Sequence, residues 1–460
     1  MKILPLSGPF HFVGIGGSGM SPLAEILRVQ GETVSGSDEK GSDTTSRLQA
    51  MGVRVHHDHD GSNVEGARCL VVSSAIKESN PELREARARG IRVVHRGDLL
   101  EAVMAPFARR IAISGSHGKT TTTAMVTGIL EAAGFDPTAL VGGKLKGSQS
   151  GARVGNGDVF VAEADESDRS FLKLHPTLSL VTNVDREHLD TYADMADVTA
   201  AFTTFALSVP AQGTAVLCAD DPVTARIAKA GGERSLTYGF SEAADVRGSV
   251  VMREDGFPRV HGQGPAGEFE FTLGVGGEMN ALNALGAMAA AQSLSVAPAL
   301  AARALASFRG VARRLEWKGR KDGVDVWDDY GHHPTEIVAT LKALKTRNPG
   351  RRLVTLFQPH RVTRTRSLWN EFTSAFSATD ELWLADIYAA GEDGEAGITA
   401  ERLVRAIVQN GQRAHFAGGL EEARANILPH LRDNDVFLTL GAGNVVEVGE
   451  ALLSEGRPRS

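Results

Sequence analysis

The sequence predicts an α/β protein with three domains. Apolar strands alternate with helices along most of the chain, which is typical of parallel sheets covered by helices. A length of 460 residues is too great for one hydrophobic core and favours about three domains of ~150 residues each. A proline break near residue 106 and a basic stretch at 309–316 set the expected domains at 1–106, 107–312 and 313–460.

Each expected strand is a short apolar run, and each expected helix ends at a glycine or a polar turn. In the first segment we expect strands at 11–17, 33–38, 69–75 and 91–97, with helices at 21–31, 47–52 and 81–90. In the second we expect strands at 110–115, 158–165, 178–184 and 214–221, part of a β-hairpin at 269–273 and an alanine-rich helix at 280–294. In the third we expect strands at 324–330, 352–358, 381–386 and 435–444, with helices at 335–346, 366–376 and 400–410.

The composition is that of an ordinary globular protein. Hydrophobic residues make up 42% of the chain, and the net charge of −7 excludes a chain built as a whole for nucleic acid or anionic membranes. Two distant cysteines, Cys69 and Cys218, exclude a disulfide framework. The chain has no apolar run long enough for a bilayer, and its first ten residues lack the apolar stretch of a signal peptide. We therefore expect a cytoplasmic protein.

A glycine turn with a lysine follows the expected strand at 110–115. The backbone N–H groups of such a turn, the start of the next helix and the Lys119 ammonium favour a phosphate site, with the Thr120 hydroxyl presented to Mg²⁺. Only two residues separate Gly115 from Gly118, fewer than in the usual phosphate-loop motif. The alternative is a helix cap in which threonines satisfy free amides. The candidate nucleotide-binding residues of this turn are Gly115, Ser116, His117, Gly118, Lys119, Thr120 and Thr121.

Acidic residues crowd the end of the expected strand at 158–165. Their carboxylates repel one another unless a cation lies among them. A metal site that serves phosphoryl transfer is one interpretation, and a solvated acidic loop is the other. The run contains Glu163, Asp165, Glu166 and Asp168.

The next expected strand, at 178–184, ends in polar residues. We expect Asn183 to cap the end of that strand. His188 could ligate a second Mg²⁺ or contact phosphate, but a lone histidine is more often structural.

The turn Gly14-x-Gly16-x-x-Gly19 follows the first expected strand and opens a helix. With Asp38 at the end of the next strand it matches a dinucleotide-binding fingerprint, and a NAD-dependent dehydrogenase is one interpretation. The stretch "HHDHD" at 56–60 is interpreted as a surface loop, because no distant metal ligand is evident for it.

Two polar groups follow strands of the third segment, where ligands of α/β sheets bind. The arginines after 352–358 could clamp a carboxylate or phosphate through their forked guanidinium groups, or form a solvated basic turn. The first group contains Asp328, Asp329, Tyr330, His332 and His333. The second group contains His360, Arg361, Arg364 and Arg366.

Taken together, these motifs resemble the Mur ligase family. The resemblance spans nearly the whole chain and is carried by "HFVGIGGSGMS", "GSHGKTTTT", "EADESD", "TNVDREHLDTY", "RRLEWKG", "DDYGHHPTE" and "FQPHRVTRT". It implies a Rossmann-like N-terminal domain that binds a UDP substrate, a central domain like a P-loop ATPase, and a Rossmann-like C-terminal domain. The short spacing from Gly115 to Gly118 is then the family's own.

The resemblance also implies ATP-driven amide formation through an acyl phosphate, with Mg²⁺ as cofactor. "DYGHHPTE" and "PHR" look most like the member that adds L-alanine to UDP-N-acetylmuramate in peptidoglycan precursor synthesis. Those two compounds are the implied partners, with no nucleic acid and no membrane.

Matching positions imply the following roles. One Mg²⁺ is held by Thr120 and Glu163 and the other by His188. The implied catalytic residues are Lys119, Glu163, Asn183, His188 and Arg314. Beyond the glycine turn, the implied ATP contacts are Asn283 for adenine, Arg314 for phosphate and Asp329 from the third domain. The implied UDP-substrate residues are Gly16, Gly17, Ser18, Gly19, Ser37, Asp38, Ser73 and Ser74. The implied amino-acid residues are Tyr330, His332, His360, Arg361 and Arg364.

Two positions depart from the family's pattern. Val362 stands where the family often has tyrosine, which loosens the wall of the amino-acid pocket, and Met279 stands where it often has histidine near adenine. Three alternatives stay open beside the alanine-adding activity. They are a sister activity that ligates a recycled tripeptide, the dehydrogenase, and a non-catalytic nucleotide-binding protein.

Overall fold

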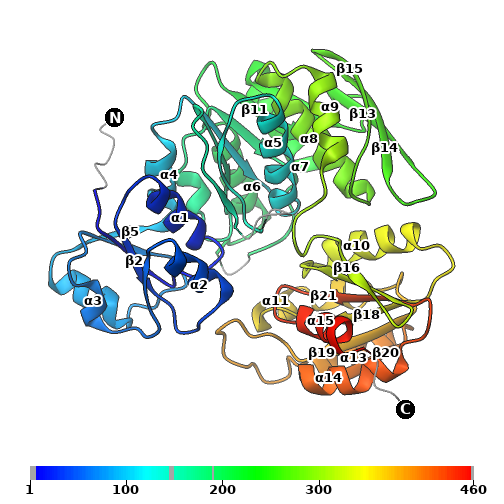
Figure 1. The fold of residues 1–460 in the computed structure, drawn as a ribbon. Helices are drawn as coiled ribbons and strands as arrows, with labels where there is room; N and C mark the ends of the chain where they lie inside the picture. Colours follow the sequence, from blue (N-terminus) through cyan, green and yellow to red (C-terminus); the bar gives the residue numbers. More distant parts are fainter. Residues whose placement is uncertain (1–6, 145–149, 189–190, 457–460) are drawn as a thin grey trace.

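Three sheets covered by helices make up the part of the chain that the structure, a computed structural model, describes: residues 7–144, 150–188 and 191–456. Parallel pairing dominates in each sheet, and the sheets form three separate bodies in Figure 1. The predicted α/β class with three domains is confirmed. The expected boundaries at 106 and 312 fall in loops between elements and stay predictions. None of the described helices is both long and apolar enough to cross a bilayer.

The N-terminal domain is a five-stranded parallel sheet in the order β3-β2-β1-β4-β5. The strand order reverses between β1 and β4, and α/β sheets bind ligands at such a point, beyond the carboxyl ends of the strands. Strand β3 was not predicted because it is only three residues long. The strands are Phe10–Val13, Val34–Ser37, Arg54–His56, Cys69–Val72 and Arg92–His95 for β1 to β5. The helices are Ser21–Val29, Asp43–Ala50, Pro81–Ala88 and Arg96–Met104 for α1 to α4, with a short 3₁₀ turn η1 at Gly61–Val64.

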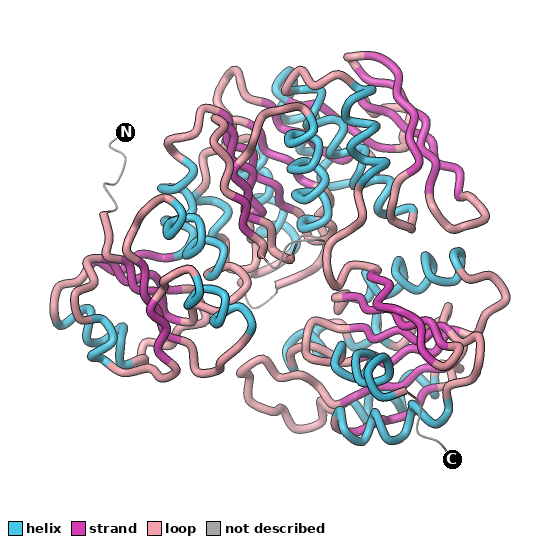
Figure 2. Tube along the Cα trace, viewed as in Figure 1, coloured by secondary structure: helices cyan, strands magenta, loops and turns pink. Residues whose placement is uncertain are grey.

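The central domain has a ten-stranded sheet in the order β15-β14-β13-β12-β11-β10-β6-β9-β7-β8. Strands β13, β14 and β15 form an antiparallel extension that contains the predicted hairpin, and Figure 2 shows it projecting far from the N-terminal sheet. The strands are Arg109–Ser114 (β6), Thr138–Leu140 (β7), Ala152–Arg153 (β8), Val159–Glu163 (β9), Leu178–Val181 (β10), Thr214–Cys218 (β11), Ser235–Gly239 (β12), Val246–Met252 (β13), Pro258–Gly264 (β14) and Gly267–Thr272 (β15). The helices are Lys119–Ala132 (α5), Met195–Ala206 (α6), Pro222–Gly231 (α7), Glu278–Ser293 (α8) and Pro298–Ser307 (α9), with 3₁₀ turns Ser170–Lys173 (η2) and Gly232–Arg234 (η3).

The C-terminal domain has a six-stranded sheet in the order β16-β17-β21-β18-β19-β20, parallel except for the edge strand β16. The helix expected at 366–376 is instead two helices separated at Leu368 (φ −113°), a residue that turns into the core beside Phe372. The strands are Glu316–Lys321 (β16), Val324–Asp329 (β17), Leu353–Phe357 (β18), Glu381–Ala385 (β19), Ala414–Gly418 (β20) and Val436–Leu440 (β21). The helices are Pro334–Arg347 (α10), Val362–Ser367 (α11), Trp369–Phe372 (α12), Ala400–Gln409 (α13), Leu420–Ile427 (α14) and Val446–Glu455 (α15), with a 3₁₀ turn η4 at Leu428–His430.

The two domain junctions differ in character. One continuous hydrophobic cluster contains side chains of both the N-terminal and the central domain, among them Leu23, Leu100 and Phe171. The hydrophobic clusters of the C-terminal domain contain only residues from Leu315 onward, within the described residues. Apolar packing therefore joins the first two domains, and the third meets them through polar side chains.

Arg313 anchors the start of the C-terminal domain. It takes a left-handed conformation (φ 60°), and its guanidinium donates to Asp328 (2.9 Å), to the Gly443 carbonyl (3.0 Å) and to the Gly441 carbonyl (2.7 Å). Asp328 is fully buried. A buried carboxylate needs such a cation, because removal of one partner leaves an uncompensated charge.

Arg313→Met is expected to remove about 3–5 kcal/mol from the unfolding free energy of the C-terminal domain. The chain's four tryptophans all lie between residues 317 and 383, so urea unfolding followed by tryptophan fluorescence reports on this domain. Arg405→Met is the matched control, because Arg405 pairs with Glu401 at the exposed surface of the same domain, and it should change stability by no more than about 0.5 kcal/mol. Equal midpoints for the two variants would contradict the anchoring role of Arg313.

Candidate active site

The glycine turn joins the buried strand β6 to the helix α5 in a shape that only glycine permits. Gly115 (φ 134°) and Gly118 (φ 83°) are both left-handed. A Cβ at Gly115 would lie 2.0 Å from Thr182 Oγ1, and one at Gly118 would lie 2.5 Å from Asn283 Oδ1. Gly118 is the residue that precedes α5 and has no side chain to cap it. The helix-cap alternative is thereby weakened, and the N–H groups at the start of this 14-residue helix suit an anion.

Lys119 is the first residue of α5, and its ammonium folds back over the turn. Nζ donates to the carbonyls of Gly115 (2.6 Å) and Ser116 (3.0 Å) and to Glu166 Oε1 (2.8 Å). Burial lowers the pKa of Lys119, but the carboxylates of Glu166 and Glu187 outweigh that effect and raise it above its ordinary value. Lys119 therefore stays a cation at the site.

Positive side chains of the protein itself accompany the acidic run. Arg96, at the start of α4 in the N-terminal domain, pairs with both Asp165 and Asp168, while Lys119 pairs with Glu166. Glu163 accepts instead from the Thr120 hydroxyl (3.0 Å) and the Gly142 amide (2.8 Å). The repulsion that the sequence predicted is thus relieved in large part by Arg96 and Lys119.

The loop after β10 brings His188 to the same place. His188 has a left-handed backbone (φ 55°), and its Nε2 lies 3.4 Å from Glu166 Oε1 and 3.7 Å from Glu187 Oε2. Burial lowers the pKa of His188, but Glu166 outweighs it and raises the pKa. Two carboxylate oxygens here, Glu166 Oε2 and Glu187 Oε1, are buried and accept no hydrogen bond from the described residues. Oxygen atoms in that condition fit a divalent cation.

The predicted metal ligands fall into two neighbouring groups. Thr120 and Glu163 touch each other, whereas His188 is grouped with Glu166 and Glu187, whose ligand atoms could hold one ion. The sequence placed Glu166 only among the candidate carboxylates of the acidic run, and it did not single out Glu187. The signal was present, because Glu166 lies in the acidic run and Glu187 directly precedes His188.

Asn183 and Asn283 flank the glycine turn. Asn183 Oδ1 accepts from the His117 amide (2.9 Å), and its Nδ2 donates to the His117 carbonyl (3.1 Å). Asn183, two residues beyond the end of β10, therefore shapes the turn. Asn283 comes from α8, next to Gly118.

The N-terminus of α10 meets the glycine turn across the junction with the C-terminal domain. His117 Nε2 lies 3.0 Å from Asp185 Oδ2, and the same oxygen accepts from the Thr335 hydroxyl (2.7 Å). On the other side of the ring, His117 Nδ1 lies 3.5 Å from Glu336 Oε1. Arg314 also reaches Glu336 Oε1, at 3.4 Å.

The predicted amino-acid residues form a row of rings at the carboxyl ends of β17 and β18. His332 lies edge-on to Tyr330 (5.6 Å between centroids) and 5.7 Å from His360, against which Arg364 also lies (3.3 Å). Burial lowers the pKa of His332 to about 4 and that of His360 to about 3, so both are neutral near pH 7. The structure adds Tyr388, which stacks flat on His360 with 10° between the rings.

Arg361, predicted to contact the amino acid, and Asp329, predicted to contact ATP, lie in opposite surroundings: Arg361 is partly exposed and Asp329 is buried. Arg361 has a left-handed backbone (φ 70°), is 41% exposed and lies 3.9 Å from Glu392. Asp329 is buried and accepts from the amides of Leu315 (2.6 Å) and Gly331 (2.7 Å). Burial raises its pKa to about 6.

The predicted UDP-substrate residues lie at the β1–β4 switch point and around it. Asp38 accepts from the Gly16 amide (2.9 Å), and the Ser74 hydroxyl donates to Asp168 of the central domain (2.7 Å). Gly19 abuts Arg96, whose Nη1 would be 3.0 Å from an added Cβ. Gly17 and Ser18 are exposed, and Ser37 is buried.

The surface-loop interpretation of 56–60 holds only in part. His57, Asp58 and Asp60 are exposed outside any helix or strand, whereas His56 ends β3 and His59 packs inward. His59 Nδ1 lies 2.9 Å from the buried carboxylate of Glu82, which also accepts from Ser37 (2.7 Å) and pairs with His11 (3.1 Å). No local pattern signals this contact, because Glu82 is 23 residues away in the sequence.

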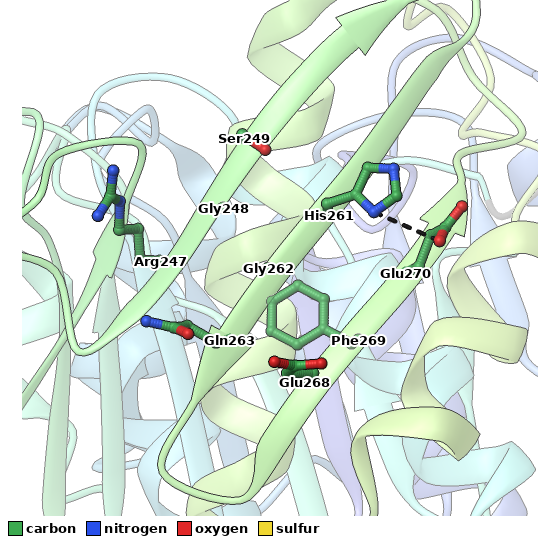
Figure 3. A pocket seen from close by; sticks show the side chains of 9 residues that line it. All are labelled: Arg247, Gly248, Ser249, His261, Gly262, Gln263, Glu268, Phe269 and Glu270. Carbon is green, nitrogen blue, oxygen red and sulfur yellow. Dashed lines mark ion pairs between the residues drawn. The ribbon is translucent and has the colours of Figure 1, made fainter.

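A surface hollow of about 570 Å³ lies elsewhere, on β13, β14 and β15 (Figure 3). Gly248 and Gly262 face each other across the two strands and leave room beside the Phe269 ring. His261 pairs with Glu270 at its edge (3.3 Å). None of the predicted site residues lines this hollow.

Comparison with known proteins explains this arrangement of three domains around one glycine turn. Models of the Mur ligase family match the chain in three consecutive parts: the catalytic domain model at 9–108, the middle domain model at 113–291 and the glutamate ligase domain model at 313–443. The chain belongs to the Mur ligase family. The family's three domain models thus fall on the three sheets of the structure.

Relatives of this Mur ligase match it along nearly its full length. It is 46% identical to the UDP-N-acetylmuramate–L-alanine ligase of Geotalea daltonii, with 97% of this chain and 98% of the relative covered. It is 47% identical to the protein of the same name from Sorangium cellulosum, with 95% and 93% covered. The crystal structure of a UDP-N-acetylmuramate–alanine ligase from Thermotoga maritima superimposes with a TM-score of 0.84 at 27% identity, over 97% of this chain and 98% of that one.

The ionisation of His117 provides a direct test of the site's electrostatics. Burial lowers its pKa, but Asp185 and Glu336 outweigh burial and raise it to about 10 from 6.5. Because the folded-state pKa is the higher one, the stabilisation is complete below pH 6.5 and is lost as the pH rises through about 10. We expect an NMR titration to show that the His117 side chain remains an imidazolium above pH 8. The His117 signal is assigned by its loss in the His117→Gln variant. A midpoint near 6.5 would contradict the pairing.

Proposed function

We propose that this Mur ligase joins L-alanine to the carboxylate of UDP-N-acetylmuramate with consumption of ATP, in peptidoglycan precursor synthesis in the cytoplasm. Eight relatives that are 43–47% identical over nearly the whole chain carry the name of that activity. The observation that carries the proposal is the meeting of Lys119 and its glycine turn with the histidine and arginine pocket of the C-terminal domain. Glu187 and Arg364 lie 3.9 Å apart at that junction.

The triphosphate of ATP is proposed to lie on the turn from Gly115 to Thr121. The left-handed glycines open the backbone, and the start of α5 supplies N–H groups and a positive dipole end. Lys119 adds a fixed positive charge where the γ-phosphoryl group departs. Asn283, beside Gly118, is proposed to contact adenine, while Arg314 and Asp329 serve the nucleotide from the C-terminal side.

Mg²⁺ fits the acidic side of this turn. Thr120 and Glu163 would hold one ion and His188 a second. Glu166 Oε2 and Glu187 Oε1 are buried and accept no hydrogen bond from the described residues, which is further support for positive charge there. When bound, Mg²⁺ supplies neutralisation of charge on the phosphates. Asn183 holds the turn in shape for both.

The proposed chemistry has two steps. A carboxylate oxygen of UDP-N-acetylmuramate attacks the γ-phosphorus, the bond to the bridging oxygen breaks, and ADP leaves from an acyl phosphate. The amine of L-alanine then attacks the acyl carbon, loses a proton, and the tetrahedral intermediate expels phosphate. A carboxylate is a poor electrophile, and phosphorylation turns one of its oxygens into a leaving group.

The amino-acid pocket is proposed to hold L-alanine by its carboxylate. Arg364 supplies a forked cation, and the neutral rings of His332 and His360 with Tyr330 enclose a small side chain. Arg361 is proposed to lie at the rim, because it is partly exposed beside Glu392. An arginine on the carboxylate leaves the amine free to attack.

The N-terminal domain is proposed to hold the UDP part at the β1–β4 switch point. The contributing residues are Gly16, Gly17, Ser18, Gly19, Ser37, Asp38, Ser73 and Ser74. The hydrogen bond from Ser74 to Asp168 places this domain directly against the acidic run. We propose 1–106, 107–312 and 313–460 as the three domains that carry these tasks.

The assay that decides the function measures phosphate release with UDP-N-acetylmuramate and ATP against a panel of L-alanine, glycine, L-serine and the recycled tripeptide. Lys119→Met should reduce turnover with L-alanine about 10²–10³-fold, because it removes a charge from the transition state. UDP-N-acetylmuramate binding, measured by calorimetry, should be unchanged. Lys342→Met, which removes an exposed ammonium paired with Glu278, is the matched control and should keep full turnover. If phosphate is released with the tripeptide and with no other compound of the panel, the tripeptide and not L-alanine is the substrate.

Arg364→Met should raise the KM for L-alanine about tenfold or more, because one charged hydrogen bond contributes about 1.5–3 kcal/mol. The KM for ATP should change little. Arg366→Met is the control from the same helix, since Arg366 is exposed and pairs with Glu395. A rise in the KM for ATP alone would contradict the proposed pocket.

A further inference from the structure

Glu336 occupies an unusual position at the start of α10. Its Oε2 accepts from the amides of His332 (3.0 Å) and His333 (3.3 Å) and so caps the helix. Its Oε1 lies 3.5 Å from Nδ1 of His117 in the central domain and 3.4 Å from Nη1 of Arg314 in its own domain. One largely buried carboxylate therefore caps the start of a helix and also meets two side chains of the proposed ATP site, His117 and Arg314.

His117 is held between carboxylates of two domains. Asp185 belongs to the central domain and lies 3.0 Å from Nε2, while Glu336 belongs to the C-terminal domain and lies on the Nδ1 side. The Thr335 hydroxyl also donates to Asp185 (2.7 Å), and the His333 ring lies 4.8 Å from the His117 ring. The contact therefore joins the glycine turn to the first residues of α10.

We infer that Glu336 is a positioning residue of the ligation reaction, which holds the His117 imidazole and the Arg314 guanidinium in place at the glycine turn. The inference rests on the proposed function, in which both residues belong to the ATP site. Glu336 belongs to the helix that follows the amino-acid residues Tyr330 and His332. The same carboxylate thereby sets the distance between the amino-acid pocket and the triphosphate.

The physical reason is charge compensation at a polar junction. His117 and Arg314 are cations from different domains, and without an anion between them they repel each other. The carboxylate is 13% exposed, so its attraction for both is screened less than it would be at the surface. Fixed donors of this kind bind a charge that develops in the transition state without having to reorganise.

Glu336→Gln is the variant that isolates this charge. Glutamine also completes a capping box, so the start of α10 is retained while the negative charge is removed. We expect kcat/KM for ATP to fall about tenfold or more, with KM for UDP-N-acetylmuramate within twofold of the parent. Glu422→Gln is the matched control, because Glu422 caps α14 through the Gly419 amide (3.0 Å) at the exposed surface, and its kinetics should equal those of the parent.

A double-mutant cycle separates positioning from a merely structural role. Once His117→Gln is present, Glu336→Gln should cost less than half of what it costs alone, because the two side chains act as a unit. The inference would be overturned if the loss of kcat/KM for ATP in the double variant equalled the product of the losses in the two single variants. It would also be overturned by a kcat/KM for ATP within twofold of the parent in Glu336→Gln, or by tighter ATP binding, since the latter would mean that Glu336 competes with phosphate.

Binding of a non-hydrolysable ATP analogue with Mg²⁺, measured by calorimetry, gives a readout that does not require ligation. The analogue should bind Glu336→Gln about tenfold more weakly than the parent, and equal affinity would overturn the inference. If the parent makes no product from L-alanine and UDP-N-acetylmuramate, the proposed function fails, and the analogue titration still decides the role of Glu336.

Discussion

The arrangement of the whole site depends on the close contact between two left-handed glycines and the side chains behind them. Gly115 rests against Thr182 and Gly118 against Asn283, so β6, β10 and α8 together define the shape of the turn. Lys119 can reach back over the carbonyls of this turn only because the chain bends there. The acidic run of β9, the neighbouring strand, is then brought next to the ammonium.

The two junctions between domains are held by different kinds of contact. The N-terminal domain shares a hydrophobic cluster with the central domain and adds the Arg96 ion pairs with Asp165 and Asp168. The C-terminal domain meets the central one through carboxylates, imidazoles, a hydroxyl group and the basic side chains of Arg364, Lys342 and Arg347, the last of which lies over the Phe257 ring. Polar interfaces of that kind allow domains to move relative to one another more readily than apolar cores do. The second junction therefore allows more relative motion of its domains than the first.

Much of the fold follows from the sequence, because strand and helix periods and glycine turns are local signals. Strands such as β6, β9 and β17 end in the polar residues that the sequence singled out. Short or exposed strands such as β3 and β20 carry too little pattern to be found. The site was predicted where its residues lie in one motif, as for Lys119. Partners such as Arg96, 69 residues from Asp165, or Glu336, far from His117, depend on domain packing, which a single sequence does not display.

The close packing behind the glycine turn limits which mutations could make this enzyme resistant to an inhibitor. Any side chain at Gly115 or Gly118 would collide with Thr182 or Asn283, so substitution there would distort the backbone of the proposed phosphate site. Few point mutations could give resistance to an inhibitor that contacts only the main chain of the turn. One that depends on side chains of the proposed amino-acid pocket, such as Tyr388, would be easier to evade, because a side chain there can change without distorting the backbone.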